Sequence, residues 1–277
     1  MSQLQKETRA SLQEVLDILK NKGVRLFIIL SGFFIANALS AEFMGVKIFS
    51  LERSVGSTPV NWSVWGNKWN FDLSAGVLLW PFVFIMTDII NEYYGRRGVK
   101  FLSYLGASLI AYAFFMFYSS IQLHPADWWA GSQQARGVVD MNASYSGIFG
   151  QGLGIIIGSL AAFLVSQLLD VTIFHAIKRR TGEGKLWLRS TGSTVFSQLI
   201  DSFVVVFIAF YFYPKWVPGN GEPWSLQQTL TVCIGGYSYK FLVAMLMTPV
   251  IYLVHDGIER YLGKELAESM RRKASEE

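Results

Sequence analysis

The sequence contains a single cysteine, Cys233, and few charged residues. One thiol excludes an intramolecular disulfide and any metal cluster held by several thiolates. Charged residues make up 16% of the 277 positions, whereas soluble domains carry about 25%. The chain also lacks the glycine-rich loop followed by Lys and Ser/Thr that binds nucleotide phosphates, so nothing in it indicates ATP hydrolysis.

Apolar residues, by contrast, are abundant and occur in long runs. Hydrophobic residues make up 52% of the chain, and its mean hydropathy is +0.33. The uncharged runs 101–123 and 141–169 both reach the roughly 20 residues that cross a bilayer. This pattern excludes a soluble single-core protein and predicts helices in lipid, because a helix satisfies its own backbone hydrogen bonds there.

Six membrane-spanning helices are predicted from the apolar segments. They cover residues 26–43, 73–93, 99–121, 146–174, 191–213 and 230–254. Most of the 24 basic residues lie in four segments that the positive-inside rule assigns to the cytoplasm, namely 1–25, 96–100, 178–189 and 256–277. The predicted fold class is therefore an all-α, six-helix membrane bundle with both termini in the cytoplasm.

The same pattern predicts three parts of the chain. Residues 1–25 form a cytoplasmic amphipathic segment, residues 26–255 form the transmembrane domain, and residues 256–277 form a cytoplasmic tail. In the first outer loop, Trp62 and Trp69 flank Gly66-Asn67. This pattern is compatible with a short hairpin whose aromatic side chains rest at the membrane interface.

The fourth predicted span carries small residues at every fourth position. They are Gly150, Gly154, Gly158, Ala162 and Ser166. Residues four apart share one face of a helix, and small side chains on that face let a neighbouring helix approach closely. We interpret this stripe as a packing surface.

Four ionisable residues lie inside predicted spans, where such groups are costly and mark functional sites. They are Asp88, Asp170, Asp201 and Lys240. One lysine cannot neutralise both Asp88 and Asp201, so at least one carboxylate must face water, a ligand or a proton. The alternative for Lys240 is a purely structural ion pair with one aspartate. The histidines stand alone, and we expect no metal ion or other cofactor.

Further polar residues extend this set. Glu92 shares a helix face with Asp88, and Asn37 adds an amide in the first span. The motif Ser-Gln-Leu-Leu/Ile-Asp occurs at 166–170 and again at 197–201, so Gln167 with Asp170, and Gln198 with Asp201, should face the interior. The recurrence indicates an inverted repeat, a common transporter design, although chance recurrence is the alternative.

Glycine and proline also interrupt the last predicted span. Gly235-Gly236 and Pro249 lie on either side of Lys240. Such residues are tolerated in membrane helices where the backbone lines a cavity. We expect the helix to be weakened at both points.

Several of these residues belong to a pattern that resembles the queuosine precursor transporters, also called the vitamin uptake transporter family. The strongest piece is Thr87-Asp88 followed by Glu92-Tyr93-Tyr94-Gly95. The pattern continues at Ala75-Gly76-Val77-Leu78, Gln167-Leu168-Leu169-Asp170-Val171, Tyr239-Lys240 and Thr248-Pro249.

The resemblance implies a bacterial inner-membrane protein that imports deazaguanine bases, the precursors of queuosine. Its partners would be the bilayer and a small planar purine-like substrate, with no nucleic acid. A carboxylate can accept the two adjacent donors of such a base, and amides can serve its carbonyl and amine groups. We assign the donor edge to Asp201 or Asp88, and the carbonyl or a counter-charge to Lys240. The full set of expected substrate-binding residues is Asn37, Asp88, Glu92, Gln167, Asp170, Gln198, Asp201 and Lys240.

The sequence has two alternative interpretations. The chain could be the substrate-binding subunit of an energy-coupling-factor uptake system, driven by a separate ATPase. An intramembrane enzyme would need a nucleophile with a base or a metal site, and no G-x-S-x-G or H-E-x-x-H motif occurs. The sequence leaves open whether transport is proton-coupled or facilitated, and whether the chain forms a homo-oligomer.

Overall fold

The computed structural model describes residues 18, 20–64, 66–182, 185–217, 219 and 222–276. Most of the amphipathic segment predicted at 1–25 lies outside these residues. The described chain is mostly helical, with short strands confined to one loop region. Five of its helical stretches are long and apolar enough to cross a membrane; they cover Lys22–Met44, Trp80–Ile121, Met141–Thr181, Leu186–Trp216 and Leu226–Leu262.

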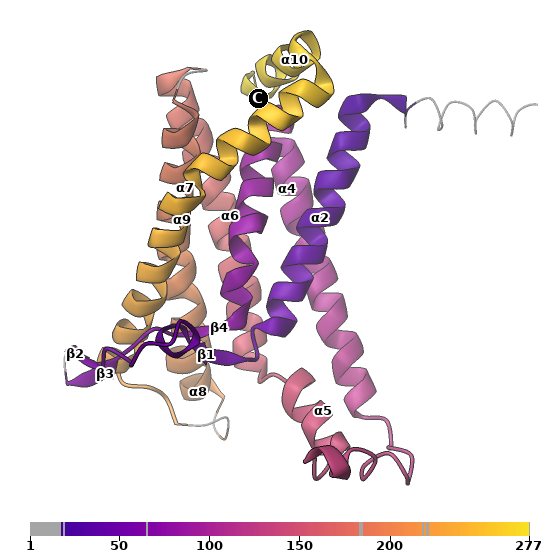
Figure 1. Ribbon diagram of the computed structural model, residues 1–277, viewed down its shortest axis with the longest axis vertical. Coiled ribbons are helices and arrows are strands. Elements are labelled where there is room, and N and C mark those ends of the chain that lie inside the picture. The colour runs from indigo at the N-terminus through magenta and orange to yellow at the C-terminus, as the bar shows by residue number, and fades with distance from the viewer. Residues whose placement is uncertain are drawn as a thin grey trace, which may run out of the picture.

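Figure 1 shows these stretches side by side in one bundle. The main helices are α2 (Lys22–Met44), α4 (Trp80–Ile121), α6 (Leu153–Thr181), α7 (Leu186–Val206) and α9 (Leu226–Leu262). The short elements are α3 (Leu51–Ser54), η1 (Ala75–Leu78), η2 (Gln134–Arg136), α5 (Met141–Phe149), η3 (Phe207–Phe212), α8 (Tyr213–Trp216) and α10 (Lys264–Ser275).

Helix α4 contains a sharp break at Gly95. This residue has φ 68° and ψ −169°, a conformation open to glycine and strained for residues with a Cβ. Figure 1 shows the chain rising through the first half of α4 and descending through the second, so both ends of α4 lie at the same end of the bundle. The predicted spans 73–93 and 99–121 correspond to these two halves, with the first beginning at Trp80 rather than at residue 73.

The fourth predicted span, 146–174, is wrong at its beginning. Residues 146–149 belong to α5, and α6 begins only at Leu153. The intervening segment Gly150-Gln151-Gly152 is not helical, as expected where two glycines weaken a helix. Gly150 therefore ends α5 and does not belong to the packing stripe.

The remaining small residues of the stripe do pack closely, as predicted. A Cβ added at Gly154 would lie 2.6 Å from the ring of Tyr213, and one at Gly158 would lie 2.9 Å from the Val205 carbonyl oxygen. Gly158 meets Val205 of α7, and Gly154 meets Tyr213 at the start of α8, which follows α7 and its π-helical continuation η3. The small side chains let the two backbones come together.

This contact gives a stability prediction. Gly158→Ala should lower the free energy of unfolding by about 1–3 kcal/mol, because the backbone oxygen of Val205 cannot move aside and the helices must separate. Gly236→Ala is the matched control, since nothing lies within 4 Å of its added Cβ; alanine there should be neutral or stabilising by about 0.5–1 kcal/mol. Thermal unfolding in detergent measures both, and equal shifts would contradict the proposed close contact.

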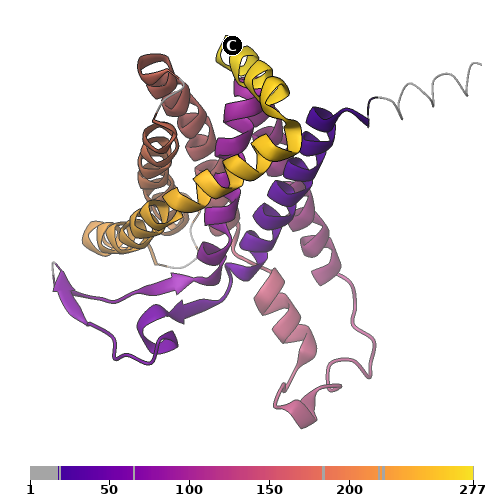
Figure 2. The same ribbon diagram turned by 45° about the horizontal axis from the view of Figure 1, so that its top comes forward.

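The C-terminal region differs from the prediction in the course of its last long helix. Helix α9 runs unbroken past Gly235, Gly236 and Pro249, so the predicted weakening does not interrupt it. The residues predicted as a tail continue α9 to Leu262 and then form α10, which packs against α4. Figure 2 shows α10 lying across the end of the bundle near the break in α4.

The first outer loop contains two small antiparallel sheets. Strands β1 (Ile48–Ser50) and β4 (Asp72–Ser74) pair with Phe49 opposite Leu73. Strands β2 (Trp62–Val64) and β3 (Asn67–Trp69) form the predicted hairpin. The rings of Trp62 and Trp69 stack with centroids 5.2 Å apart, and Trp69 packs against Gly235 of α9. The loop is thereby held over one end of α9.

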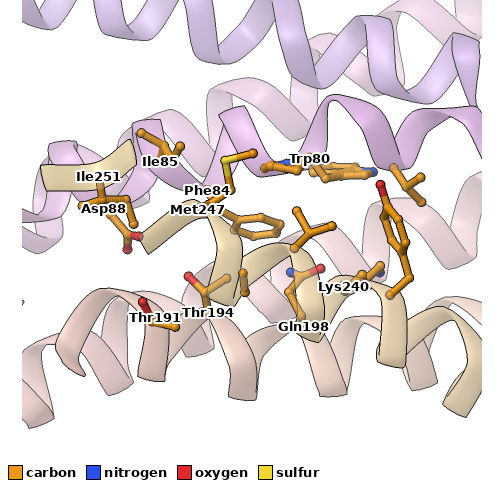
Figure 3. Close-up of a pocket in the computed structure, with 15 residues that line it drawn as sticks. Trp80, Phe84, Ile85, Asp88, Thr191, Thr194, Gln198, Lys240, Met247 and Ile251 are labelled. Atoms are coloured by element: carbon orange, nitrogen blue, oxygen red, sulfur yellow. The ribbon is translucent and has the colours of Figure 1, made fainter. Parts of the chain in front are cut away.

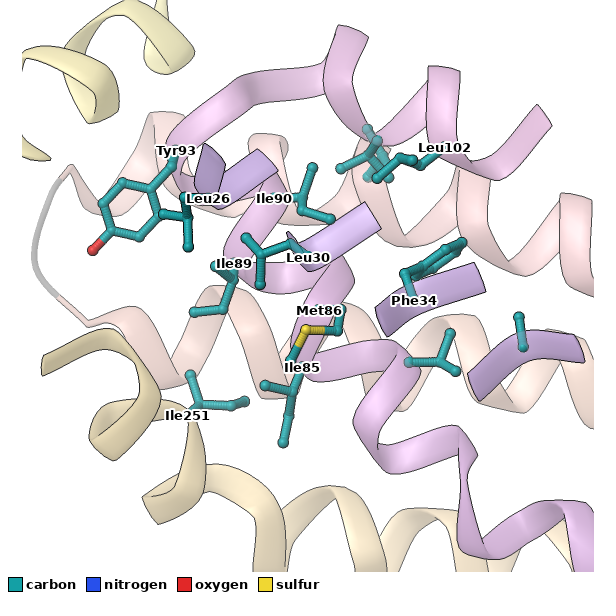
Figure 4. Close-up of a cluster of buried hydrophobic side chains, with 14 of the residues drawn as sticks. Leu26, Leu30, Phe34, Ile85, Met86, Ile89, Ile90, Tyr93, Leu102 and Ile251 are labelled. Carbon is teal, nitrogen blue, oxygen red and sulfur yellow. The ribbon is translucent and has the colours of Figure 1, made fainter. Parts of the chain in front are cut away.

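The apolar core lies between α2, both halves of α4 and α6. Leu26, Leu30 and Phe34 recur every fourth residue of α2 and face the bundle. Figure 4 shows them against Ile89 and Ile90 of α4. This packing fixes the rotation of the first half of α4, which turns its other face toward α7 and α9.

Candidate functional site

A cavity lies between the first half of α4, α7 and α9. Figure 3 shows Asp88 and Thr191 toward one end of it and Gln198 and Lys240 toward the other. Its lining residues are Val77, Trp80, Pro81, Phe84, Ile85, Asp88, Thr191, Thr194, Gln198, Tyr239, Lys240, Val243, Ala244, Met247 and Ile251. Three of the predicted site residues therefore share one cavity.

Helical spacing explains why these side chains converge. On α4, Trp80, Phe84 and Asp88 follow one another at intervals of four residues and so lie on one face. On α7, Thr191, Thr194 and Gln198 are spaced by three and four. Each helix therefore presents one stripe, partly polar and partly apolar, to the cavity.

Asp88 occupies one polar end of the cavity. Its side chain is buried, and Oδ2 accepts a hydrogen bond from the Ser190 hydroxyl of α7. Oδ1 has no hydrogen-bond partner among the described residues. An unpaired carboxylate oxygen in a buried position is costly unless a donor from a ligand, water or a proton reaches it.

Lys240, which pairs with Asp201, occupies the other polar end of the cavity. Nζ of Lys240 lies 2.5 Å from Oδ2 of Asp201, and both side chains are partly exposed, at 17% and 18%. Gln198 lies one helical turn before Asp201, and its Nε2 has no partner among the described residues. Lys240 and Gln198 thus offer a cation and an amide donor at this end, and the carboxylate of Asp201 lies beside the cation.

The walls between the two ends are mainly apolar. Trp80 and Phe84 come from α4, and Met247 and Ile251 come from α9. Figure 3 shows their side chains between Asp88 and Lys240. Apolar walls with a few convergent polar groups are typical of small-molecule sites.

Two predicted residues lie behind the cavity rather than in its lining. Gln167 and Asp170 on α6 are fully buried. The Thr87 hydroxyl donates to Oε1 of Gln167 at 3.2 Å, and the Ser197 hydroxyl donates to Oδ1 of Asp170 at 3.2 Å. The second contact joins the two copies of the repeated motif across the antiparallel α6–α7 interface.

Glu92 is engaged elsewhere. Its Oε1 lies 2.8 Å from Nη2 of Arg189, and its Oε2 accepts from Nε of Arg189 at 3.1 Å and Nζ of Lys178 at 3.3 Å. All three side chains are almost fully buried. This fork-shaped ion cluster ties α4, α6 and α7 together and lies outside the cavity lining.

Asn37 also lies outside the cavity. Its Nδ2 donates to the Phe33 carbonyl oxygen of its own helix at 2.8 Å. A buried acid that sequence reasoning did not nominate, Glu42, lies further along α2 and accepts a hydrogen bond from Ser159 at 3.0 Å. Neither residue belongs to the cavity lining.

Sequence reasoning also missed the aromatic and hydroxyl lining. Trp80, Phe84 and Thr191 were not nominated, although the spacing of Trp80 and Phe84 from Asp88 places them on one face. The signal was available in the four-residue periodicity, because a functional acid near the middle of a helix defines which neighbours face the same space.

The part of the chain that contains the cavity is similar to a known protein family. A family model described as "Putative vitamin uptake transporter" matches residues 74–254, which include every residue of the cavity lining. The chain belongs to this family. It is a multi-pass membrane protein, and family membership indicates transport rather than catalysis.

Curated relatives from three bacteria support the assignment. The chain is 32% identical over 186 residues to the "Probable queuosine precursor transporter" of Bacillus subtilis (strain 168), covering 66% of this chain and 72% of that protein. A protein of Haemophilus influenzae with the same name is 25% identical over 200 residues, with 71% and 74% covered. The "Queuosine precursor transporter" of Escherichia coli (strain K12) is 24% identical over 185 residues, with 66% and 72% covered. No solved structure matches the chain.

Proposed function

We propose that this chain imports queuosine precursors, which are deazaguanine bases, across the bacterial inner membrane through the α4–α7–α9 cavity. The observation that carries the proposal is the cavity itself, with Asp88 at one end, Gln198 and Lys240 toward the other, and aromatic walls between them. A planar base with donors along one edge and a carbonyl along another fits such a site. The names of the three relatives support the same cargo.

We further propose that the chain crosses the membrane six times with both termini in the cytoplasm. The reversal at Gly95 supports this, since it divides α4 into two crossings. The N-terminal end of α2 and helix α10 lie at the same end of the bundle in Figure 1, as an even number of crossings requires. The described parts of the basic segments assigned to the cytoplasm, 20–25, 96–100, 178–182, 185–189 and 256–276, lie at the same end.

The relatives are named as transporters, which supports a complete carrier rather than a subunit that depends on a separate ATPase. Vesicles containing only this chain test the point. Uptake of labelled aminomethyl-deazaguanine without added ATPase or ATP is expected. Uptake that requires ATPase subunits would refute this part of the proposal. Competition with cyano-deazaguanine and with queuine then defines which base is preferred.

Asp88→Asn tests whether Asp88 accepts the N–H donors along one edge of the substrate. We expect uptake at low substrate concentration to fall about 10- to 150-fold, because an amide cannot accept two donors side by side as an ionised carboxylate does. Asp256→Asn serves as the control, since Asp256 pairs with Arg260 on the exposed surface of α9. Parental uptake by Asp88→Asn at equal expression would remove Asp88 from the site.

A further inference from the structure

The cavity-facing side of α9 continues beyond the cavity, toward the beginning of that helix. The α9 residues that line the cavity at four-residue intervals share one helix face; they are Tyr239, Val243, Met247 and Ile251. Gly235 precedes Tyr239 by four residues and therefore belongs to the same face. It is buried, although it does not line the cavity. A group that covers Gly235 thus lies over the end of the cavity wall formed by α9.

The side chain of Trp69 covers Gly235. A Cβ added to Gly235 would lie 2.1 Å from Nε1 of Trp69, so the indole ring lies directly against the backbone of α9. Glycine leaves room for this close approach, and a larger residue does not. The ring of Trp69 also contacts Phe71, with centroids 4.7 Å apart.

From Trp69 the chain leads to the opposite wall of the cavity. Residues 69–77, here named the strap, run from the end of β3 through β4 into η1. Val77, the last residue of the strap, lines the cavity just before α4 begins. Figures 1 and 2 show this part of the chain passing from the end of α9 to the end of α4. The strap therefore joins the α9 and α4 walls at one end of the cavity.

The two ends of the strap are attached in different ways. Main-chain hydrogen bonds hold the part that leads to α4. The N–H of Phe71 donates to Oε1 of Glu52 at 3.0 Å, and the N–H of Ala75 donates to the carbonyl oxygen of Lys47 at 2.8 Å. At the other end, no hydrogen bond joins the strap to α9 among the residues that the structure describes.

The contact between Trp69 and Gly235 leaves one polar group unsatisfied. The indole N–H of Trp69 is buried and has no hydrogen-bond partner in the described part of the chain. An unpaired buried donor raises the free energy of this arrangement, because the same group bonds to water when it is exposed. The contact therefore consists of ring packing alone, and it separates without loss of a hydrogen bond.

We propose that the strap closes the outer end of the cavity, and that Trp69 must leave Gly235 before a substrate enters. The hydrogen-bonded part next to α4 stays in place, and the Trp69 end moves away from α9. The outer position of the strap rests on the six-crossing topology, and the identity of the substrate rests on the import function, both proposed above. The closure itself depends on neither.

Thiol labelling of right-side-out vesicles tests the closure. The reporter is Ala244→Cys, which lines the cavity, in a chain whose native thiol is removed by Cys233→Ala. A membrane-impermeant maleimide added outside should label this reporter slowly, because access follows the fraction of molecules in which the strap is open. Trp69→Ala should raise the labelling rate about tenfold or more, since it removes the ring that packs on Gly235.

Gly235→Ala tests the same contact from α9 and keeps the tryptophan. The added Cβ should displace the indole ring and raise the labelling rate as Trp69→Ala does. Gly236→Ala is the matched control, since nothing lies within 4 Å of its added Cβ. Trp128→Ala is the control for loss of an outer-loop tryptophan, since Trp128 is 73% exposed. Both controls should label at the parental rate.

Three results would overturn the proposal. Fast labelling of the parental reporter would show that the cavity is already open to the outside. Parental labelling rates in both Trp69→Ala and Gly235→Ala would show that this contact does not control access. Labelling that increases only when the maleimide is inside the vesicles would place the strap on the cytoplasmic side.

Cross-linking tests whether the strap must open during transport. In Trp69→Cys/Gly235→Cys, again with Cys233→Ala, a cleavable bifunctional thiol reagent links the strap to α9. Uptake of labelled aminomethyl-deazaguanine should be lost after linking and should recover when the reagent is cleaved. The two single-cysteine variants should keep their uptake in the reagent. Undiminished uptake by the linked protein overturns the required opening. If the parental chain takes up no base, the proposed cargo fails, and the labelling rates alone decide whether the strap closes the cavity.

Discussion

Replacing Arg189 by methionine is expected to lower the free energy of unfolding by about 3 kcal/mol or more. Arg189 is 1% exposed and binds both carboxylate oxygens of Glu92. Removing one partner of a buried ion pair leaves the other charge without compensation, a loss of about 3–5 kcal/mol. Lys178 still contacts Glu92, so the lower part of this range is expected.

Thermal or denaturant unfolding in detergent measures the loss. Arg179→Met is the matched control, because Arg179 is an exposed residue next to Lys178 on the same helix. Its effect should stay within about 0.5 kcal/mol. Arg189→Lys should recover only part of the stability, since lysine keeps the charge but not the planar fork. Similar effects of Arg189→Met and Arg179→Met would show that the cluster does not hold α4, α6 and α7 together.

Lys240→Ala is expected to lower uptake about 30- to 5000-fold at low substrate concentration. The change removes the cation at one end of the cavity and leaves the carboxylate of Asp201 partly buried and unpaired. Truncating one partner of such a pair generally costs about 2–5 kcal/mol. Vesicle uptake, corrected for the amount of folded protein, measures this effect.

A double variant separates the two roles that the sequence left open for Lys240. In Lys240→Gln/Asp201→Asn both charges are removed and two amides face each other. If Lys240 only neutralises Asp201, this variant should transport nearly as well as the parent. If Lys240 contacts the substrate, as we propose, uptake should stay as low as in Lys240→Ala. Recovery of uptake in the double variant would therefore exclude a direct role.

Much of the helical arrangement could be predicted from sequence, because apolar length and the positions of basic residues are local properties. The errors arose where local signals were ambiguous. The run 141–169 is uncharged throughout, so hydropathy could not reveal that the helix is interrupted between Phe149 and Leu153. Gly235 and Pro249 suggested breaks that α9 does not show, since packing against neighbouring elements outweighs weak local preferences.

The candidate site was also predicted only in part, but the reason differs from that for the helices. Burial of Asp88 and Asp170, and partial burial of Lys240, followed from their positions in apolar segments. Their partners did not, because a partner depends on how each helix is rotated about its axis. Glu92 follows Asp88 by four residues and therefore lies on the same face of α4. It is one turn further along the helix, however, where it meets Arg189 and Lys178 and does not reach the cavity.

The amino-acid sequence by itself determined that this protein lies in a bilayer and that its helices carry charges in the middle of the membrane. It also showed that the motifs around these charges resemble those of one family of transporters. Only the tertiary structure decided that Asp88 faces a cavity, that Lys240 pairs with Asp201, and that Glu92 belongs to a separate ion cluster. The physical reason is that insertion into lipid depends on the apolar length of each segment. Neutralisation of a buried charge depends instead on side chains that several helices bring together.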